Sequence, residues 1–317
     1  MLKETMNNVY VVGQLVKKDL AIKNVDVKDK DGNVVGQEQA ISGNLIIRTL
    51  DGSENEVSYF AKKMKKDGSG ENSIFKGLET VMNEYKALEQ FPNEADIIKI
   101  GSGQFNVQDY KGKDGEVKTY AGIKANFANR LTQKEIETTP MDAKFEIEGV
   151  VSKLEEEVYK NEPTGNAKVT VNLLGYEGTI IPVVLTVPKS IAEPFMSAGF
   201  FEGGFAKFTG KLVNTKETVE VIEKMAFGSD NVKVVTTTVS RKEIMGGSPK
   251  GSPIEHEIDE AEYAQAIAKR KLKLDKIKNE PAKVANTNGA PPINNPFATG
   301  GTVTNQTANP FNPFATK

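Results

Sequence analysis

Residues 6–20 carry the strongest fold signal in this chain and read Met6-Asn7-Asn8-Val9-Tyr10-Val11-Val12-Gly13-Gln14-Leu15-Val16-Lys17-Lys18-Asp19-Leu20. Apolar residues alternate along this run well enough to predict a half-buried β-strand. Gly13 interrupts the alternation, and a strongly bent barrel strand needs a residue without a side chain at such a point. The run therefore predicts one strand of a β-barrel, although by itself it would also suit an amphipathic strand of any β protein.

The pattern of residues 7–131 predicts the other strands of such a barrel. Short β-like runs alternate there with clusters of Gly, Asp and Asn, and one helix-like segment, Ser73 to Gln90, falls between the third and fourth runs. Five strands with a helix between the third and the fourth is the order of the OB-fold, a small closed β-barrel. The five runs are Asn8 to Lys18, Ile41 to Leu50, Glu56 to Lys63, Ile97 to Tyr110 and Val117 to Asn129.

The same order recurs over residues 142–244. Lys144 to Leu154 repeats a strand with a central glycine, and a short helix candidate again separates the third run from the fourth. A repeat of roughly 130 residues suits a duplicated domain rather than a solenoid. The sequence therefore predicts a mainly β fold with two tandem five-stranded OB-like barrels, residues 1–136 and 142–244, of which the second is more diverged. The other elements predicted for this unit are Ala167 to Leu174, Thr179 to Val187, the helix Pro188 to Ala198, Gly204 to Asn214 and Thr218 to Phe227.

A predicted β-hairpin in the first unit, residues 103–123, indicates which kind of OB-fold protein this chain resembles. The run Gly103 to Tyr110 leads into a polar turn, where Asp114-Gly115 is a strong hairpin signal, and Val117 to Ile123 returns as a strand. Together with the Met-Asn-x-Val and Gly-x-Leu of residues 6–20, this hairpin resembles the single-stranded DNA-binding proteins of bacterial and phage type. The resemblance implies an OB-fold that binds single-stranded DNA without much sequence preference, in DNA replication, recombination or repair. Divergence and the duplicated barrel indicate a phage or mobile element.

A nucleic-acid face needs two kinds of side chain. Aromatic rings stack bases, for about 1 to 3 kcal/mol each, while lysines follow the phosphates. Neighbours such as Tyr59 and Phe60 point to opposite faces of a strand, so at least one of them is expected in the core, and for Phe60 and Phe105 core and surface are equally open. The lysines from Lys62 to Lys66 could equally form a solvated loop. The candidate DNA-binding residues are Tyr10, Lys17, Lys18, Tyr59, Lys62, Lys63, Lys65, Phe105, Tyr110, Lys111, Lys113, Lys118 and Tyr120.

Two departures from the family pattern concern the contacts rather than the fold. The chain has no tryptophan, so stacking falls to Tyr and Phe, and Gln14 stands where relatives often carry a basic residue. The second unit is more acidic, with Glu155-Glu156-Glu157 following its first strand, and this favours a supporting role for it. If the second barrel does bind nucleic acid, its candidates are Tyr159, Tyr176, Phe205, Lys207, Phe208, Lys211 and Arg241.

The amino-acid composition changes after residue 244. Residues 245–253 form a linker by composition, and residues 254–279 predict a charged amphipathic helix whose acidic start and basic end suit the helix dipole. This helix could pack on its own barrels or bind a partner. Residues 280–317 are almost without charge and rich in Asn, Thr, Gly and Pro, so we expect a disordered tail. Its three Asn-Pro-Phe motifs predict docking of replication or recombination proteins through Phe297, Phe311 and Phe314.

Composition limits the other possibilities. Among 317 residues, 41 Lys and Arg nearly balance 43 Asp and Glu, for a formal net charge of -2, so any nucleic-acid site must be a local patch. There is no cysteine, and the single histidine, His256, lies at the start of the charged helix, so we expect no enzyme, metal site or cofactor. No apolar run is long enough to span a bilayer, which predicts a cytoplasmic protein, while self-association stays open. The alternative is a β-rich virion, scaffold or protein-interaction protein without nucleic-acid binding.

Overall fold

The computed structural model describes residues 4–29, 31–159, 161–223, 227, 231–248 and 260–279, and at residues 28, 159, 216–223 and 231–237 it describes the backbone alone. Several sequence predictions lie outside the described residues. These are most of the linker, the start of the charged helix with His256, and the tail with Phe297, Phe311 and Phe314; the side chain of Tyr159 is also not described.

The first barrel contains the elements β1 (Asn7–Lys28), β2 (Val34–Arg48), β3 (Glu54–Lys62), α1 (Ser73–Glu84), β4 (Ile97–Gly101), β5 (Gln104–Lys111), β6 (Val117–Lys124) and β7 (Phe127–Arg130). Strands β1, β2 and β3 form an antiparallel meander, and β3 then pairs in parallel with β6. Strand β6 pairs antiparallel with β5, while β4 returns to β1 and closes the barrel. This confirms the predicted OB-fold order. The single predicted run Ile97 to Tyr110 is divided into β4 and β5 at Ser102, whose φ of 54° departs from strand geometry.

The second barrel follows the short helix α2 (Gln133–Thr138) and contains β8 (Ala143–Tyr159), β9 (Glu162–Gly175), η1 (Tyr176–Gly178), β10 (Thr179–Val187), η2 (Lys189–Ile191), α3 (Ala192–Ser197), β11 (Phe205–Glu223) and β12 (Asn231–Ser248). Strands β8, β9 and β10 pair antiparallel in sequence order, and β10 pairs in parallel with β12. Strand β12 pairs with β11, which returns to β8. The two barrels therefore close in the same order, as the sequence repeat predicts.

The predicted fifth strand of the second barrel, Thr218 to Phe227, is wrong. Strand β11 continues through residues 215–217, which separate two of the predicted strands, and the fifth strand is β12. The β11–β12 register runs without interruption from Gly210↔Ile244 to Glu223↔Asn231, so both strands extend well beyond the part that closes the barrel. Threonine-rich stretches such as Thr236-Thr237-Thr238 suit long ribbons because β-branched residues favour extended backbone.

Glycine is required where the first strand of each barrel passes close to the second. A Cβ atom added to Gly13 of β1 would lie 2.2 Å from the carbonyl oxygen of Arg48, and one added to Gly149 of β8 would lie 2.5 Å from the carbonyl oxygen of Asn172. Each distance is too short for any side chain to fit. The central glycine seen in both sequence units therefore marks the same close approach of backbones.

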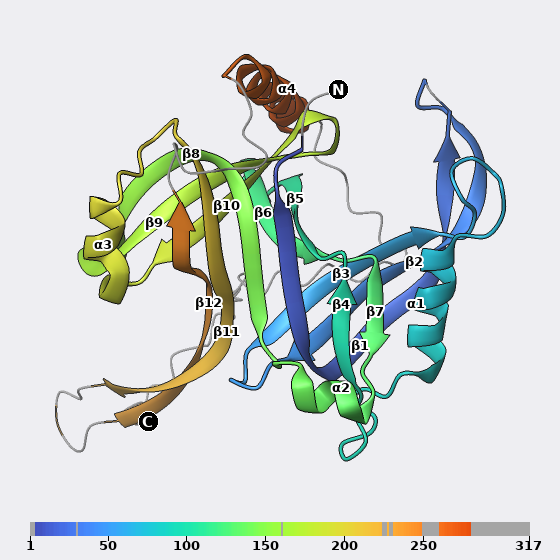
Figure 1. The fold of residues 1–317 in the computed structure, drawn as a ribbon, viewed down its shortest axis with the longest axis horizontal. Coiled ribbons are helices and arrows are strands. Elements are labelled where there is room, and N and C mark those ends of the chain that lie inside the picture. Colours follow the sequence, from blue (N-terminus) through green and yellow to red (C-terminus); the bar gives the residue numbers. More distant parts are fainter. Residues whose placement is uncertain are drawn as a thin grey trace, which may run out of the picture. The chain divides into compact units, whose positions relative to one another are not determined.

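The two barrels share strand β1 and one hydrophobic core. Residues Asn7–Val11 of β1 pair antiparallel with Ala143–Ile147 of β8, and Figure 1 shows the two strands side by side. Beneath them the Phe105 and Phe145 rings meet edge to face, with centroids 5.8 Å apart. The buried Asn7 amide donates to the carbonyl of Phe105 and accepts from its backbone N–H, both at 2.9 Å. The two hydrogen bonds of the Asn7 side chain thus join β1 to β5 in the way that a pair of backbone hydrogen bonds would.

Replacing Asn7 should destabilise the fold more than replacing its neighbour. Asn7→Ala leaves a buried N–H and a buried carbonyl of Phe105 without partners, and we expect a loss of roughly 2 kcal/mol or more in the free energy of unfolding. Asn8→Ala, which removes the same group one residue later, should cost less than about 0.5 kcal/mol. Urea denaturation of the two variants measures the difference, and equal losses would show that the Asn7 amide has no special role.

Candidate nucleic-acid interface

Three aromatic side chains lie on the outer surface of neighbouring strands in the first barrel. Alternation along β3 places Val57, Tyr59 and Ala61 in the core and directs Phe60 outward. On β5 and β6 the buried positions Phe105, Val107 and Ile123 are apolar, while Tyr110 and Tyr120 face out. Phe60 is 45% exposed, and Tyr110 and Tyr120 are each 40% exposed. We call the outward surface of β3, β5 and β6 that carries Phe60, Tyr110 and Tyr120 the aromatic face.

The register of the β5–β6 hairpin brings its two tyrosines together. Tyr110 pairs with Lys118 and Gln108 pairs with Tyr120, so the tyrosines are diagonal neighbours on one face of the hairpin, within reach of one another. The Tyr120 ring leans over Gly122, where its Cε1 atom lies 2.8 Å from the position that a Cβ would take. Burial of this ring, with the nearby charge of Glu56, raises the pKa of Tyr120. Because Gly122 has no side chain, the Tyr120 ring can occupy the space above it.

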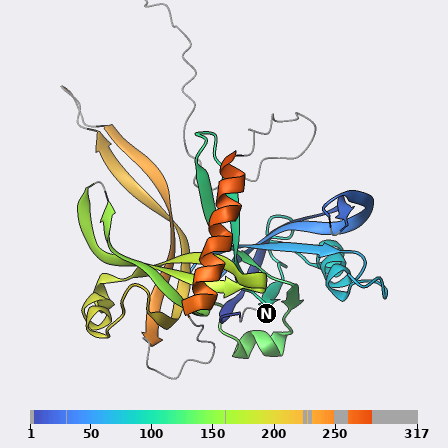
Figure 2. The same ribbon diagram turned by 90° about the horizontal axis from the view of Figure 1, so that it is seen from above.

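The opposite face of the same hairpin is held by the helix α4 (Glu260–Asn279). The Asp109 carboxylate, whose side chain is 0% exposed, accepts from Arg270 Nη2 at 2.9 Å and Lys273 Nζ at 3.1 Å, and Thr119 Oγ1 also donates to it at 2.8 Å. Arg270 Nη1 donates at 3.1 Å to the carbonyl of Ile180 in the second barrel. Figure 2 shows α4 alongside the hairpin. The helix thereby ties the tyrosine-bearing hairpin to the second barrel.

Apolar packing fixes the other half of α4. Ala266 is fully buried in a small cluster with Val150, Leu174, Ile180 and Phe205 of the second barrel, and Tyr263 packs against it. The Tyr263 hydroxyl also accepts from the side chain of Asn172 at 2.8 Å. Of the two possibilities left open by the sequence, packing on its own barrels is therefore observed over the described part of this helix.

The network around Asp109 makes stability depend on pH. Burial alone would raise the pKa of Asp109, but hydrogen bonds from Thr119 and Lys273 and the charge of Arg270 outweigh it and hold the pKa below its usual value. Because the folded pKa is depressed, this stabilisation is present above the unfolded pKa and is lost as the pH falls through the folded value.

Replacing Asp109 should therefore matter most at neutral pH. Asp109→Asn leaves Arg270 without its buried counter-ion, and we expect a loss of roughly 3 kcal/mol in the free energy of unfolding at pH 7. The difference from the parent protein should shrink as the pH falls below about 4. Denaturant titrations at pH 7 and pH 3 measure both values, with Asp275→Asn on the exposed side of α4 as the matched control. A loss that is the same at both pH values would contradict the role given to the ion pair.

Two of the predicted aromatic contacts are wrong. Tyr59 is only 3% exposed and Phe105 only 1%, so neither ring can stack a base. Tyr59 shares β3 with Phe60, and the strand turns the tyrosine inward, where burial raises its pKa. Among the described residues its hydroxyl has no hydrogen-bond partner. Tyr10 is exposed, but it lies opposite Lys144 in the β1–β8 pairing, and among the described strands β1 pairs with β2, β4 and β8 rather than with β3 or β6.

The predicted lysines divide into those bound within the chain and those in exposed loops. Lys18 donates to the carbonyls of Met82 and Tyr85 at the end of α1, at 2.7 and 2.6 Å, and burial lowers its pKa against the opposing charge of Asp96. Lys111 donates to the carbonyl of Lys278 in α4, away from the aromatic face. Both ammonium groups are thus held by carbonyls of the chain itself, and their assignment as DNA contacts stays a prediction. Lys62 pairs with Glu38, Lys63 with Gln39 and Lys118 with Asp114, whereas Lys17 is partly buried and Lys65 and Lys113 are exposed.

The second barrel does not repeat the aromatic face. Gly149, Asn172 and the parallel pair Thr186↔Glu243 occupy the positions of Gly13, Arg48 and the pair Ser58↔Lys124. This correspondence places Pro188 where the first barrel has Phe60, and Val239 where it has Tyr120. Among its predicted contacts, Phe205 and Phe208 are buried, Lys207 and Lys211 pair with Glu146 and Glu243, and Tyr176 and Arg241 are exposed.

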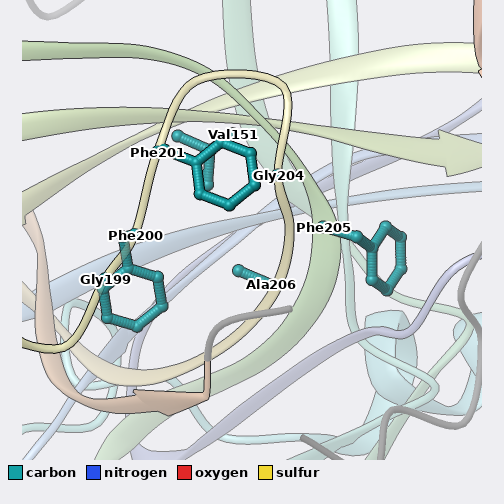
Figure 3. Close-up of a pocket in the computed structure, with 7 residues that line it drawn as sticks. All are labelled: Val151, Gly199, Phe200, Phe201, Gly204, Phe205 and Ala206. Carbon is teal, nitrogen blue, oxygen red and sulfur yellow. The ribbon is translucent and has the colours of Figure 1, made fainter. Parts of the chain in front are cut away.

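An apolar dimple with no room for even one water molecule lies beside α3 in the second barrel (Figure 3). Phe200 and Phe201 line it together with Val151, Ala206 and glycine backbone, while the Phe205 ring points the other way, toward the cluster under α4. The side chains that line it offer no polar group to orient a ligand. The aromatic face is therefore the better candidate site.

Sequence reasoning missed the polar side chains that surround the aromatic face. Asn44 and Glu56 lie on β2 and β3, and Asn106 and Gln108 lie on β5, all at outward positions. Their signal was the period of two within each strand, which places Glu56 on the same side as Phe60, and Asn106 and Gln108 on the same side as Tyr110.

The strand order and the aromatic face define an OB-fold protein with a candidate single-strand interface. The chain belongs to the YorF family, whose model matches residues 6–280. No curated protein matches it in sequence. Among the described helices, none has the length and apolar character needed to cross a membrane.

Two solved structures are similar at low identity. One is a deletion mutant of the single-stranded DNA-binding protein from Thermus aquaticus, with 15% identity over 81% of this chain and 98% of that chain, at a TM-score of 0.40. The other is a replication protein A heterotrimer bound to single-stranded DNA, with 12% identity over 88% of this chain and 54% of that chain, at a TM-score of 0.19. Both TM-scores are below 0.5, so the fold assignment rests on the strand pairing of the chain itself.

Proposed function

We propose that the first barrel binds single-stranded DNA, without strict sequence specificity, through the aromatic face. The observation that carries this proposal is the exposure of Phe60, Tyr110 and Tyr120 on the outward surface of one OB-fold barrel. In this fold the surface of the second and third strands and the loop between the fourth and fifth serve as the usual binding surface for single strands. Phe60 lies on the third strand, and the tyrosines lie beside the fourth-to-fifth connection.

Support also comes from the way the β5–β6 hairpin is held. Its Asp109 face is tied down by Arg270 and Lys273, so the opposite face presents Tyr110 and Tyr120 on a fixed backbone. A platform that is ordered before binding loses less conformational entropy when a base stacks on it. The second barrel and α4 thus have a supporting role in this proposal.

Removing the exposed rings should weaken binding of single strands. Phe60→Ala, Tyr110→Ala and Tyr120→Ala should each reduce affinity by roughly fivefold to a hundredfold, because a stacked base contributes about 1 to 3 kcal/mol. Fluorescence anisotropy with a mixed-sequence single-stranded oligonucleotide, at two salt concentrations and against the matching duplex, measures this. Tyr176→Ala, at an exposed tyrosine of the second barrel, is the matched control.

Failure of this proposal would be plain in the same assay. If the parent protein does not bind the oligonucleotide even at low salt, the result would favour the alternative of a β-rich virion or scaffold protein. If it binds but all three variants keep full affinity with an unchanged unfolding temperature, the aromatic face is not the site.

The wider role that we propose is a binding protein, rather than an enzyme, in DNA replication, recombination or repair. We further propose that it acts in the cytoplasm of a bacterial host, as a phage or mobile-element product. Its Asn-Pro-Phe motifs, at Phe297, Phe311 and Phe314, would recruit replication or recombination proteins to the bound strand. Repetition of the motif supports this, because several weak sites on one chain act together.

Truncation after Pro281 tests the division of labour between barrel and tail. The truncated protein should keep its affinity for single strands within about twofold, because the aromatic face is intact, and it should lose partner capture in a pull-down from host extract. Replacing Phe297, Phe311 and Phe314 together by Ala in the full chain should give the same result. A large loss of DNA affinity on truncation would contradict the proposed separation.

A further inference from the structure

The surroundings of Tyr120 are suited to base edges rather than to phosphates. Gln108 lies directly across from Tyr120, and Asn106 lies across from Gly122, over which the Tyr120 ring leans. On the other side, β3 carries Glu56 at the outward position next to Ser58, which pairs with Asn44 of β2. Amide and carboxylate groups donate to and accept from bases, but a carboxylate repels the phosphate backbone.

Glu56 is the unexpected member of this group, because it is an acid on a face proposed to hold a polyanion. Its side chain accepts a hydrogen bond from Asn44 Nδ2 at 2.5 Å. Partial burial and the neighbouring Asp19 raise the pKa of Glu56, although the Asn44 bond and the charge of Lys17 oppose this rise. Its charge also contributes to the raised pKa of Tyr120. At neutral pH it is ionised, and Asn44 occupies only part of its accepting capacity.

We propose that Glu56 makes the aromatic face favour guanine over thymine in a bound single strand. This inference rests on the proposed function and names the base that the Tyr120 position prefers. Guanine presents two adjacent donors, N1–H and the N2 amino group, which match the two oxygens of a carboxylate. Thymine presents one donor, N3–H, between two carbonyl oxygens that a carboxylate repels. Cytosine and adenine, with one amino group each, fall between these extremes.

The geometry allows stacking and edge contact at the same time. The Tyr120 ring leans over Gly122, and Glu56 belongs to the strand that pairs with β6 at Val57↔Ile123 and Ser58↔Lys124. Extending that parallel register by one residue sets Glu56 beside Gly122. A base stacked on Tyr120 therefore has the Glu56 carboxylate at its edge, held in place by Asn44.

Three oligonucleotides that differ at isolated positions test this preference. The first is all thymine, the second replaces every fourth thymine with guanine, and the third replaces the same positions with inosine, which lacks the N2 amino group. The spacing avoids guanine runs. The parent protein should bind the guanine oligonucleotide about fivefold or more tighter than the thymine one, because a two-point contact of this kind contributes about 1 to 3 kcal/mol. The inosine oligonucleotide should fall between.

Glu56→Gln should remove the preference without removing the site. The variant should bind the guanine and thymine oligonucleotides within about twofold of each other, and its affinity for thymine should be unchanged or higher because a negative charge has left the face. A merely structural effect would weaken both oligonucleotides together. Glu54→Gln, the same change two residues earlier on the same strand, should keep the guanine preference. Asn44→Ala should reduce it, because the carboxylate loses the bond that orients it.

The outcomes separate this inference from the function on which it rests. Equal affinity of the parent protein for all three oligonucleotides, or an unchanged guanine preference in Glu56→Gln, would overturn the inference and leave single-strand binding in place. Absence of binding to every oligonucleotide would overturn both.

Discussion

Strand β1 is the constraint on which the rest of the structure depends, because it pairs with neighbours of both barrels. It forms ladders with β2 and β4 of the first barrel and with β8 of the second, and the Asn7 amide adds two hydrogen bonds to the backbone of Phe105. Phe105 in turn packs against Phe145 in the shared core. Since a buried backbone group without a partner is costly, these contacts hold β5 against β1 and so fix where the β5–β6 hairpin leaves the barrel.

The β5–β6 hairpin has two faces with different roles. Alternation along β5 turns Asp109 toward α4 and Tyr110 away from it, so one strand carries both an anchoring charge and an exposed ring. The second barrel keeps the close backbone contact at Gly149 but has Pro188 and Val239 where the first barrel has Phe60 and Tyr120. The second barrel thus shares the close backbone contact of the first but lacks its exposed rings, which agrees with the supporting role proposed for it.

Local patterns were enough to predict the strand order of the first barrel and the central glycine of each unit, because these depend on periods of two and on residues a few positions apart. They were not enough to predict which of Tyr59 and Phe60 faces the core, since the phase of a strand is set by partners distant in the sequence. The partners of Lys18 were hidden for the same reason, because its ammonium donates to carbonyls 64 and 67 residues away. The contact of Arg270 with Asp109, 161 residues apart, leaves no local trace at all.

The arrangement of charge also decides what kind of single-strand contact is possible. Lys62 and Lys118 already pair with Glu38 and Asp114, and an exposed ion pair of this kind is worth only about 0 to 1 kcal/mol. When such a lysine moves to a phosphate it exchanges one weak ion pair for another, so it adds little net affinity. With a formal charge of -2 and Glu56 on the face itself, the long-range attraction for a polyanion is small as well. Affinity for the proposed strand must then come mainly from stacking, which every base can provide, and from contacts to base edges, which alone distinguish one base from another.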